Sequence, residues 1–68
     1  MIVHAIVDGR TTYEVELDEN SGRYYLVEKI GMKRQTGRIL LKSWGYVAAC
    51  GEAEAIANTE RTESRQPA

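Results

Sequence analysis

The segment from Thr11 to Asp18 alternates without interruption between two kinds of side chain. Its odd-numbered positions are mainly apolar and its even-numbered positions are polar or acidic: Thr11, Tyr13, Val15 and Leu17 against Thr12, Glu14, Glu16 and Asp18. A period of two predicts a β-strand that turns one face to a core and the other to water. Strands of this kind occur in antiparallel sheets, which commonly leave one face solvated. We therefore expect the chain to form a β-sheet with its hydrophobic core on one face.

Three further segments complete the predicted sheet. The first runs over residues 1–7, the third over residues 23–30 and the fourth over residues 38–47, with turn-forming clusters at residues 8–9, 19–22 and 31–37. In the fourth segment apolar side chains fall on both faces: Ile39, Leu41 and Ser43 on one, and largely Leu40, Trp44 and Tyr46 on the other. Apolar residues on both faces predict a central strand, or a strand with one face under another element.

The turn at residues 8–9 allows two registers for the first hairpin. A two-residue turn pairs Ile6 with Thr11, whereas a three-residue turn pairs Val7 with Thr11. These registers bury opposite faces of the first strand, because a slip of one residue turns every side chain over. The core face of the first strand is accordingly either Ile2, His4 and Ile6 or Val3, Ala5 and Val7.

The composition changes at Ala48. Residues 48–58 are rich in alanine and glutamate, which lose little side-chain entropy in a helix, so we expect a short helix docked on the sheet. Residues 58–68 carry no aliphatic or aromatic side chain besides the terminal alanine, which predicts a flexible tail. The predicted fold class is α+β, with a four-stranded antiparallel sheet and one short C-terminal helix in a single β-rich domain over residues 1–57.

The length of the chain, 68 residues, places its core near the lower limit for independent folding, since such a domain buries only about 60% of its unfolded surface. With one cysteine, Cys50, and one histidine, it lacks an intrachain disulfide and the ligands of a Cys/His metal site. We expect stability to come from packing, from a partner protein or from a second copy. No apolar run approaches the ~20 residues of a membrane span and the start lacks a secretory pattern, so we expect a cytoplasmic location without membrane contact.

The side chains that carry most enzyme chemistry are sparse. His4 lies within an apolar strand, which favours a structural imidazole over a general base. Cys50 has no basic neighbour in the sequence that would favour its thiolate, so we expect an inert thiol. The carboxylates of Glu14, Glu16 and Asp18 share one strand face and indicate a solvated acidic stripe. We therefore expect no catalytic or metal site, no cofactor and no small-molecule substrate: a protein that binds rather than an enzyme.

Charge is divided unevenly along the chain. Residues 8–19 hold five acidic residues against one basic, a net charge of −4, whereas residues 23–42 hold six basic residues against one acidic, a net charge of +5. A basic ribbon with aromatic neighbours suits an acidic protein surface or a phosphate backbone. Equally, basic residues protect strand edges from aggregation. The predicted partner-binding residues are Arg23, Tyr25, Lys29, Lys33, Arg34, Arg38, Lys42 and Trp44.

Two stretches resemble known families. Three short motifs mark the segment from residue 23 to residue 60: GRI at 37–39, KSWGY at 42–46 and EAEA at 52–55. This segment resembles the arm-type DNA-binding domains of tyrosine-family phage integrases, which are three-stranded sheets with a C-terminal helix, although the basic run before their helix is replaced here by residues 47–50. Residues 47–57, VAACGEAEAIA, resemble a stretch in one group of phage-encoded anti-CRISPR proteins. That resemblance implies a small inhibitor that blocks a bacterial defence complex through charge-complementary surfaces.

The leading hypothesis is a small non-enzymatic phage or mobile-element protein that binds and modulates, most simply by inhibition, a bacterial protein complex. Aromatic and arginine residues dominate most interfaces, so the candidate anchors are Trp44, Tyr24, Tyr25 and Tyr46. One alternative is a nucleic-acid-binding module that uses the same basic ribbon, against which stands a pI near 5.8. Another is a structural homodimer in which exposed strand edges pair.

Overall fold

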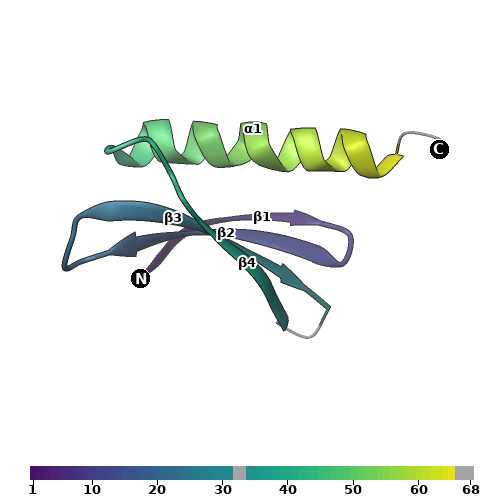
Figure 1. Ribbon diagram of the computed structural model, residues 1–68, viewed down its shortest axis with the longest axis horizontal. Helices are drawn as coiled ribbons and strands as arrows, with labels where there is room; N and C mark the ends of the chain where they lie inside the picture. The colour runs from purple at the N-terminus through teal and green to yellow at the C-terminus, as the bar shows by residue number, and fades with distance from the viewer. Residues whose placement is uncertain (32–33, 66–68) are drawn as a thin grey trace.

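The protein forms a four-stranded antiparallel sheet followed by a helix, which confirms the predicted fold class; the computed structural model describes residues 1–31 and 34–65. The strands lie in chain order across the sheet, so each pairs with the next through a hairpin. The elements are β1 (Ile2–Asp8), β2 (Thr11–Asp18), β3 (Arg23–Ile30), β4 (Arg34–Leu40) and α1 (Tyr46–Arg65). Figure 1 shows α1 lying along one face of the sheet, and we call the opposite face the open face.

Both predicted registers of the first hairpin are wrong. Asp8 pairs with Thr11, so the two-residue turn begins at Gly9, one residue later than predicted. Gly9 has a φ of 61°, which glycine adopts without a steric penalty and which favours the turn at this position. The pairing differs from the two-residue alternative by two residues, so the same side chains share a face, and Ile6 lies opposite Tyr13 on the side of the core.

A β-bulge near the start of β1 changes which side chains reach the core. Ile2 and His4 are two residues apart on β1 but pair with adjacent residues of β2, which makes Val3 the extra residue. Val3 packs against the core, whereas Ile2 is 52% exposed. The core contacts of β1 therefore come from one member of each predicted set, Val3 and Ile6.

The fourth strand lies earlier in the chain than predicted and at the edge of the sheet rather than at its centre. β4 covers residues 34–40 instead of 38–47, so residues 34–37 of the predicted turn at 31–37 belong to the strand. Trp44 lies in the loop that follows, and Tyr46 begins α1. The apolar residues on both faces of β4 reflect exposure at an edge rather than burial, because Ile39 and Leu40 are 46% and 48% exposed.

The helix is longer than predicted at both ends. It begins at Tyr46 instead of residue 48 and continues to Arg65 instead of residue 58. Residues 59–65, which were expected to belong to the tail, are thus helical, and residues 66–68 lie outside the described residues. Beyond residue 58 the helix still contacts the sheet, because the buried side chain of Tyr13 is hydrogen-bonded to Glu60, two turns beyond Ala53. A helix with little apolar surface of its own is stabilised by such docking.

Alanine residues line the face of α1 that meets the sheet. Ala49, Ala53 and Ala57 are spaced by four residues, which places them on one helix face, and none is more than 1% exposed. Their small side chains let α1 approach the sheet closely. The larger side chains of this core come from the sheet and the loop that follows it: Tyr13, Val15, Leu26 and Leu41.

Candidate functional site

The open face of the sheet consists of rows that cross all four strands. Each row takes one residue from each strand: Ile2, Glu16, Tyr25 and Leu40 in one, and Ala5, Glu14, Val27 and Arg38 in the next. A further pair, Asp18 and Arg23, continues this face at the ends of β2 and β3. The acidic stripe of β2 and the basic residues of β3 and β4 are separate in the sequence, but the register makes them neighbours on one face.

Val27 is buried on the open face, although α1 covers the other side of the sheet. It is 1% exposed, and its cross-strand partners are Glu14 and Arg38. Long side chains cover it in two pairs: Lys29 Nζ lies 2.6 Å from Glu14 Oε1, and Arg38 Cζ lies 3.7 Å from the centre of the Tyr25 ring. Two of the predicted partner-binding cations are therefore held, Lys29 by an ion pair and Arg38 by a cation–π contact.

A second pair of arginine and aromatic side chains lies where the chain leaves the sheet after β4. Arg23 Cζ lies 3.8 Å from the centre of the Trp44 ring, and Arg23 Nη2 donates to the carbonyl oxygen of Leu41 at 2.8 Å. The indole nevertheless stays 68% exposed. Arg23 thus connects the start of β3 to the loop and orients Trp44 on the surface without burying it.

Most of the large exposed apolar residues belong to the ends of elements that lie at one end of the molecule, where β1, β3 and α1 begin and β4 ends (Figure 1). The Tyr46 hydroxyl donates to the Val3 carbonyl oxygen at 3.4 Å, which ties the start of α1 to β1 there. The members at this end are Met1, Ile2, Leu40, Trp44, Tyr46 and Val47, with exposures from 48% to 80%.

Glu52 of α1 holds the loop that carries Trp44. Its Oε2 accepts a hydrogen bond from the Lys42 N–H at 3.0 Å, and its Oε1 accepts from the Ser43 N–H at 3.0 Å and from the Ser43 hydroxyl at 2.9 Å. Burial alone raises the pKa of Glu52, but these hydrogen bonds and the charge of Lys42 outweigh it and lower the pKa below its ordinary value of 4.5. The loop is therefore fixed to the helix by an ionised carboxylate.

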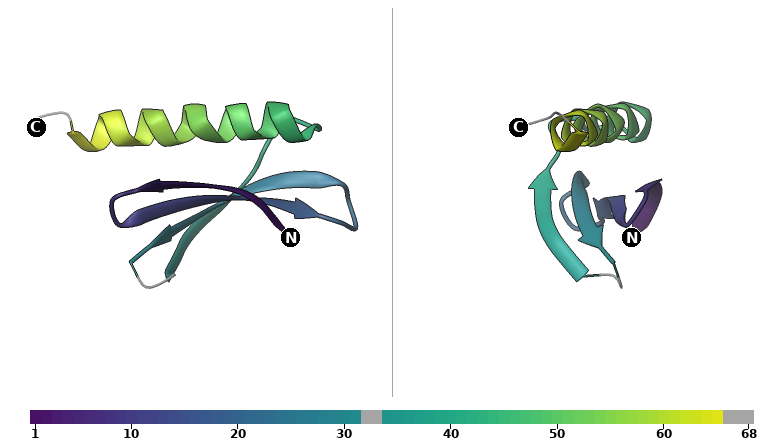
Figure 2. Two further views of the ribbon diagram at one scale, coloured as in Figure 1. Left: turned by 180° about the vertical axis from the view of Figure 1, so that it is seen from behind. Right: turned by 90° about the vertical axis from the view of Figure 1, so that its right-hand side faces the viewer.

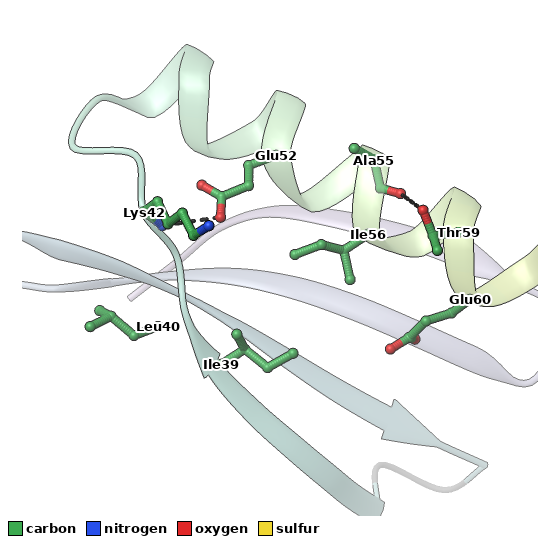
Figure 3. Close-up of a pocket in the computed structure, with 8 residues that line it drawn as sticks. All are labelled: Ile39, Leu40, Lys42, Glu52, Ala55, Ile56, Thr59 and Glu60. Carbon is green, nitrogen blue, oxygen red and sulfur yellow. Dashed lines mark hydrogen bonds between the residues drawn. The ribbon is translucent and has the colours of Figure 1, made fainter.

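A groove of about 670 Å³ runs between β4 and α1. It exists because α1 packs against β1, β2 and β3, while β4 curves away from the helix (Figure 2). In Figure 3, Ile56 extends from α1 toward the strand that carries Ile39, whereas Leu40 turns to the other side of β4. The groove is apolar in its middle and polar toward its ends, where it is lined by Lys42, Glu52, Thr59 and Glu60.

The structure brings together most, but not all, of the predicted partner-binding residues. Lys42 lies on the groove side rather than on the open face, Lys33 lies outside the described residues, and Arg34 belongs to β4 through its backbone. Leu40 and the groove residue Ile39 were not among the predicted site residues; the signal for them is the apolar run at residues 39–41, which was assigned to a buried strand. We define the aromatic–arginine patch as Arg23, Tyr25, Arg38, Leu40 and Trp44.

The residues considered for catalysis lie on separate elements. His4 is half-buried in β1 opposite Val15, and Cys50 is a half-buried free thiol in α1. Within residues 1–31 and 34–65, no group of three or more His, Cys, Asp and Glu side chains is arranged to hold a metal ion. In the same part of the chain, no helix has the length and apolar character that crossing a membrane requires.

Comparison with known proteins identifies no relative. No protein-family model matches the sequence, and neither curated proteins nor solved structures give a significant match. The class of protein that the fold and the site define is a small α+β domain in which, over residues 1–31 and 34–65, one sheet face is left open by the helix and β4 forms an edge of the sheet.

Proposed function

We propose that this chain is a small non-enzymatic binding protein, of the kind that phages and mobile elements encode. In this proposal it modulates, most simply by inhibition, a bacterial protein complex by docking an acidic surface of that complex on the aromatic–arginine patch. The observation that carries the proposal is the pair of arginine–aromatic stacks, Arg38 on Tyr25 on the open face and Arg23 on Trp44 in the loop that follows β4. The resemblance of residues 47–57 to a stretch of anti-CRISPR proteins supports the assignment to a phage inhibitor.

Ordered arginine and aromatic side chains are well suited to binding. A few such residues supply most of the energy in protein interfaces, and side chains that are already fixed lose less entropy when a partner arrives. Trp44 is held by Arg23 yet remains 68% exposed, and the guanidinium of Arg38 is held over Tyr25 while the residue stays exposed. A guanidinium in this position can make bidentate hydrogen bonds to a carboxylate of the partner.

The charges beside the patch favour a protein partner over nucleic acid. Glu14, Glu16 and Asp18 lie on the same open face, one strand away from the basic residues of β3. Lys29 is already paired with Glu14. A phosphate backbone that followed the sheet would be repelled by this acidic stripe, whereas a protein surface of limited size can place its carboxylates over Arg38 alone.

Capture from a nuclease-treated bacterial lysate, followed by titration of the captured partner, tests the proposal. Trp44→Ala should weaken binding by about 30-fold or more, because loss of a central aromatic anchor costs roughly 2 kcal/mol or more. Val7→Ala removes an apolar side chain that is 71% exposed at the other end of the sheet and should change little. Undiminished capture by Trp44→Ala, or loss of every captured partner on nuclease treatment, would contradict the proposal.

A further inference from the structure

The outer edge of β4 is a free sheet edge, since in the described part of the chain no strand pairs with it. The Leu41 N–H donates to the Tyr24 carbonyl oxygen at 2.9 Å. Hydrogen-bonded positions alternate along an antiparallel strand, so Ile39 also directs its backbone groups toward β3. Arg38 and Leu40 therefore direct their N–H and C=O groups outward, away from the sheet.

The regular part of this free edge is short. A β-bulge interrupts the pairing of β4 opposite Glu28 and Lys29, and the Thr36 hydroxyl donates to Glu28 Oε1 at 3.0 Å beside it. Bulges and charged side chains are common devices that protect an edge strand from unspecific pairing. They leave residues 37–40 as the segment that can accept another strand, next to the apolar groove formed with α1.

We propose that this edge takes an extended segment of the partner as a fifth strand, and that the segment alternates apolar and acidic side chains. The inference rests on the proposed function and names the part of the partner that is recognised. Addition of a strand to a sheet edge uses backbone hydrogen bonds for affinity and pockets for alternate side chains for specificity. Here the outward groups of Arg38 and Leu40 supply the hydrogen bonds, and the groove supplies the pocket.

The two sides of the added strand meet different surroundings. On the side of α1 its side chains meet Ile39 and Ile56, which requires apolar residues. On the open face a cross-strand neighbour of Arg38 lies within about 5.5 Å in Cβ separation, which requires an acidic residue.

The acidic residues at the groove belong to α1, so they face the side on which the segment presents its apolar side chains. Both carboxylate oxygens of Glu52 accept hydrogen bonds from the loop, and Glu60 is hydrogen-bonded to Tyr13. Within residues 37–40 the charged side chain is Arg38, which is exposed on the open face. The edge therefore selects acidic over basic side chains.

A titration of the isotope-labelled full chain with two synthetic peptides tests this inference. One peptide alternates valine and glutamate over about eight residues, and the matched peptide alternates valine and lysine. The glutamate peptide should shift the amide signals of Arg38 and Leu40 and the methyl signals of Ile56, and it should slow amide exchange at Arg38 and Leu40. Equal binding of the lysine peptide, or shifts confined to Tyr25 and Trp44, would overturn the proposal.

A proline at position 40 tests the backbone contact directly. Leu40→Pro removes an outward N–H that the ladder with β3 does not use, and proline is tolerated on edge strands. It should weaken binding of the glutamate peptide by about tenfold or more, whereas Leu40→Ala, which keeps the N–H, should weaken it less. Equal binding by Leu40→Pro and wild type would refute strand addition. If the proline variant is unstable, amide exchange in the wild-type chain provides the test instead. Unchanged exchange at Arg38 and Leu40 in the presence of the glutamate peptide would then refute strand addition.

The outcomes separate this inference from the proposed function. If Trp44→Ala loses the captured partner but Leu40→Pro retains it, the aromatic–arginine patch binds and the inference about the β4 edge is wrong. If neither variant loses the partner, both proposals fail. If light scattering shows that Leu40→Pro converts a dimer to a monomer, the edge pairs with a second copy and strand addition by the partner is refuted.

Discussion

A leucine in place of Ala53 tests how closely α1 lies on the sheet. Ala53 is fully buried and shares its cluster with Val15 and Leu26, which are at most 1% exposed. The three added carbon atoms have no space and must move the helix or distort a rotamer, which costs about 1–3 kcal/mol. A chain of this length has a free energy of unfolding of roughly 3–10 kcal/mol, so the loss is a large fraction of the total.

Urea unfolding followed by circular dichroism measures this loss. The matched control is Ala48→Leu, which makes the same change at an exposed position of α1 and should alter the free energy of unfolding by less than about 0.5 kcal/mol. Alanine and leucine are both good helix formers, so helix propensity contributes little to the change in the free energy of unfolding. Equal stability of the two variants would refute the conclusion that the alanine face of α1 sets the spacing between helix and sheet.

Two further predictions concern pH. The folded-state pKa of Glu52 is lowered, so its contribution to stability is present above pH 4.5 and is lost as the pH falls through the folded-state pKa. Glu52→Gln should remove this acid dependence of the free energy of unfolding, as measured by urea titrations. The same acid dependence in Glu52→Gln and in the wild type would refute the prediction. Burial and nearby carboxylates raise the pKa of Tyr13 from 10.0 to about 12, so stability is complete below 10.0 and is lost as the pH rises toward 12. Tyr13→Phe should abolish that alkaline loss and Tyr25→Phe should keep it, as unfolding curves across this range will show; an equal loss in both would contradict the assignment.

The central strands were predictable because their patterns are local. β2 matches the predicted segment residue for residue, since its alternation requires one face in the core and one in water. β3 also matches, because the turn cluster at 19–22 limits it on one side and Gly31 on the other. These two strands form the centre of the sheet, where each pairs with a strand on both sides.

The predictions of the first register, of β4 and of the length of α1 were wrong because these features depend on contacts between residues that are distant in the sequence. The first register depends on which residue of the turn takes positive φ, and either Asp8 or Gly9 as first turn residue satisfies the alternation. The position of β4 depends on its pairing with β3, and its apolar residues look alike whether they are buried or exposed at an edge. The part of α1 beyond residue 58 contacts the sheet through Tyr13 and Glu60, which are 47 residues apart in the sequence.

The candidate site was predictable in composition but not in arrangement. The sequence indicates a basic ribbon with aromatic neighbours, and Arg23, Tyr25, Lys29 and Arg38 do share the open face. Which cation pairs with which side chain follows from register: Lys29 meets Glu14, while Arg38 meets Tyr25. The β4–α1 groove depends on where the helix lies on the sheet, and no spacing in the sequence specifies that position.

The most direct test of binding through the aromatic–arginine patch is the affinity of the full chain for its captured partner, measured by calorimetry for two charge reversals. Arg38→Glu reverses a charge within the patch, and Arg10→Glu makes the same change at an exposed position in the first turn. Binding should weaken by about tenfold or more for Arg38→Glu and stay within about twofold for Arg10→Glu, because only a charge at the interface affects dissociation. Equal affinities for Arg38→Glu and the wild type, or equal losses for both variants, would contradict binding at the patch.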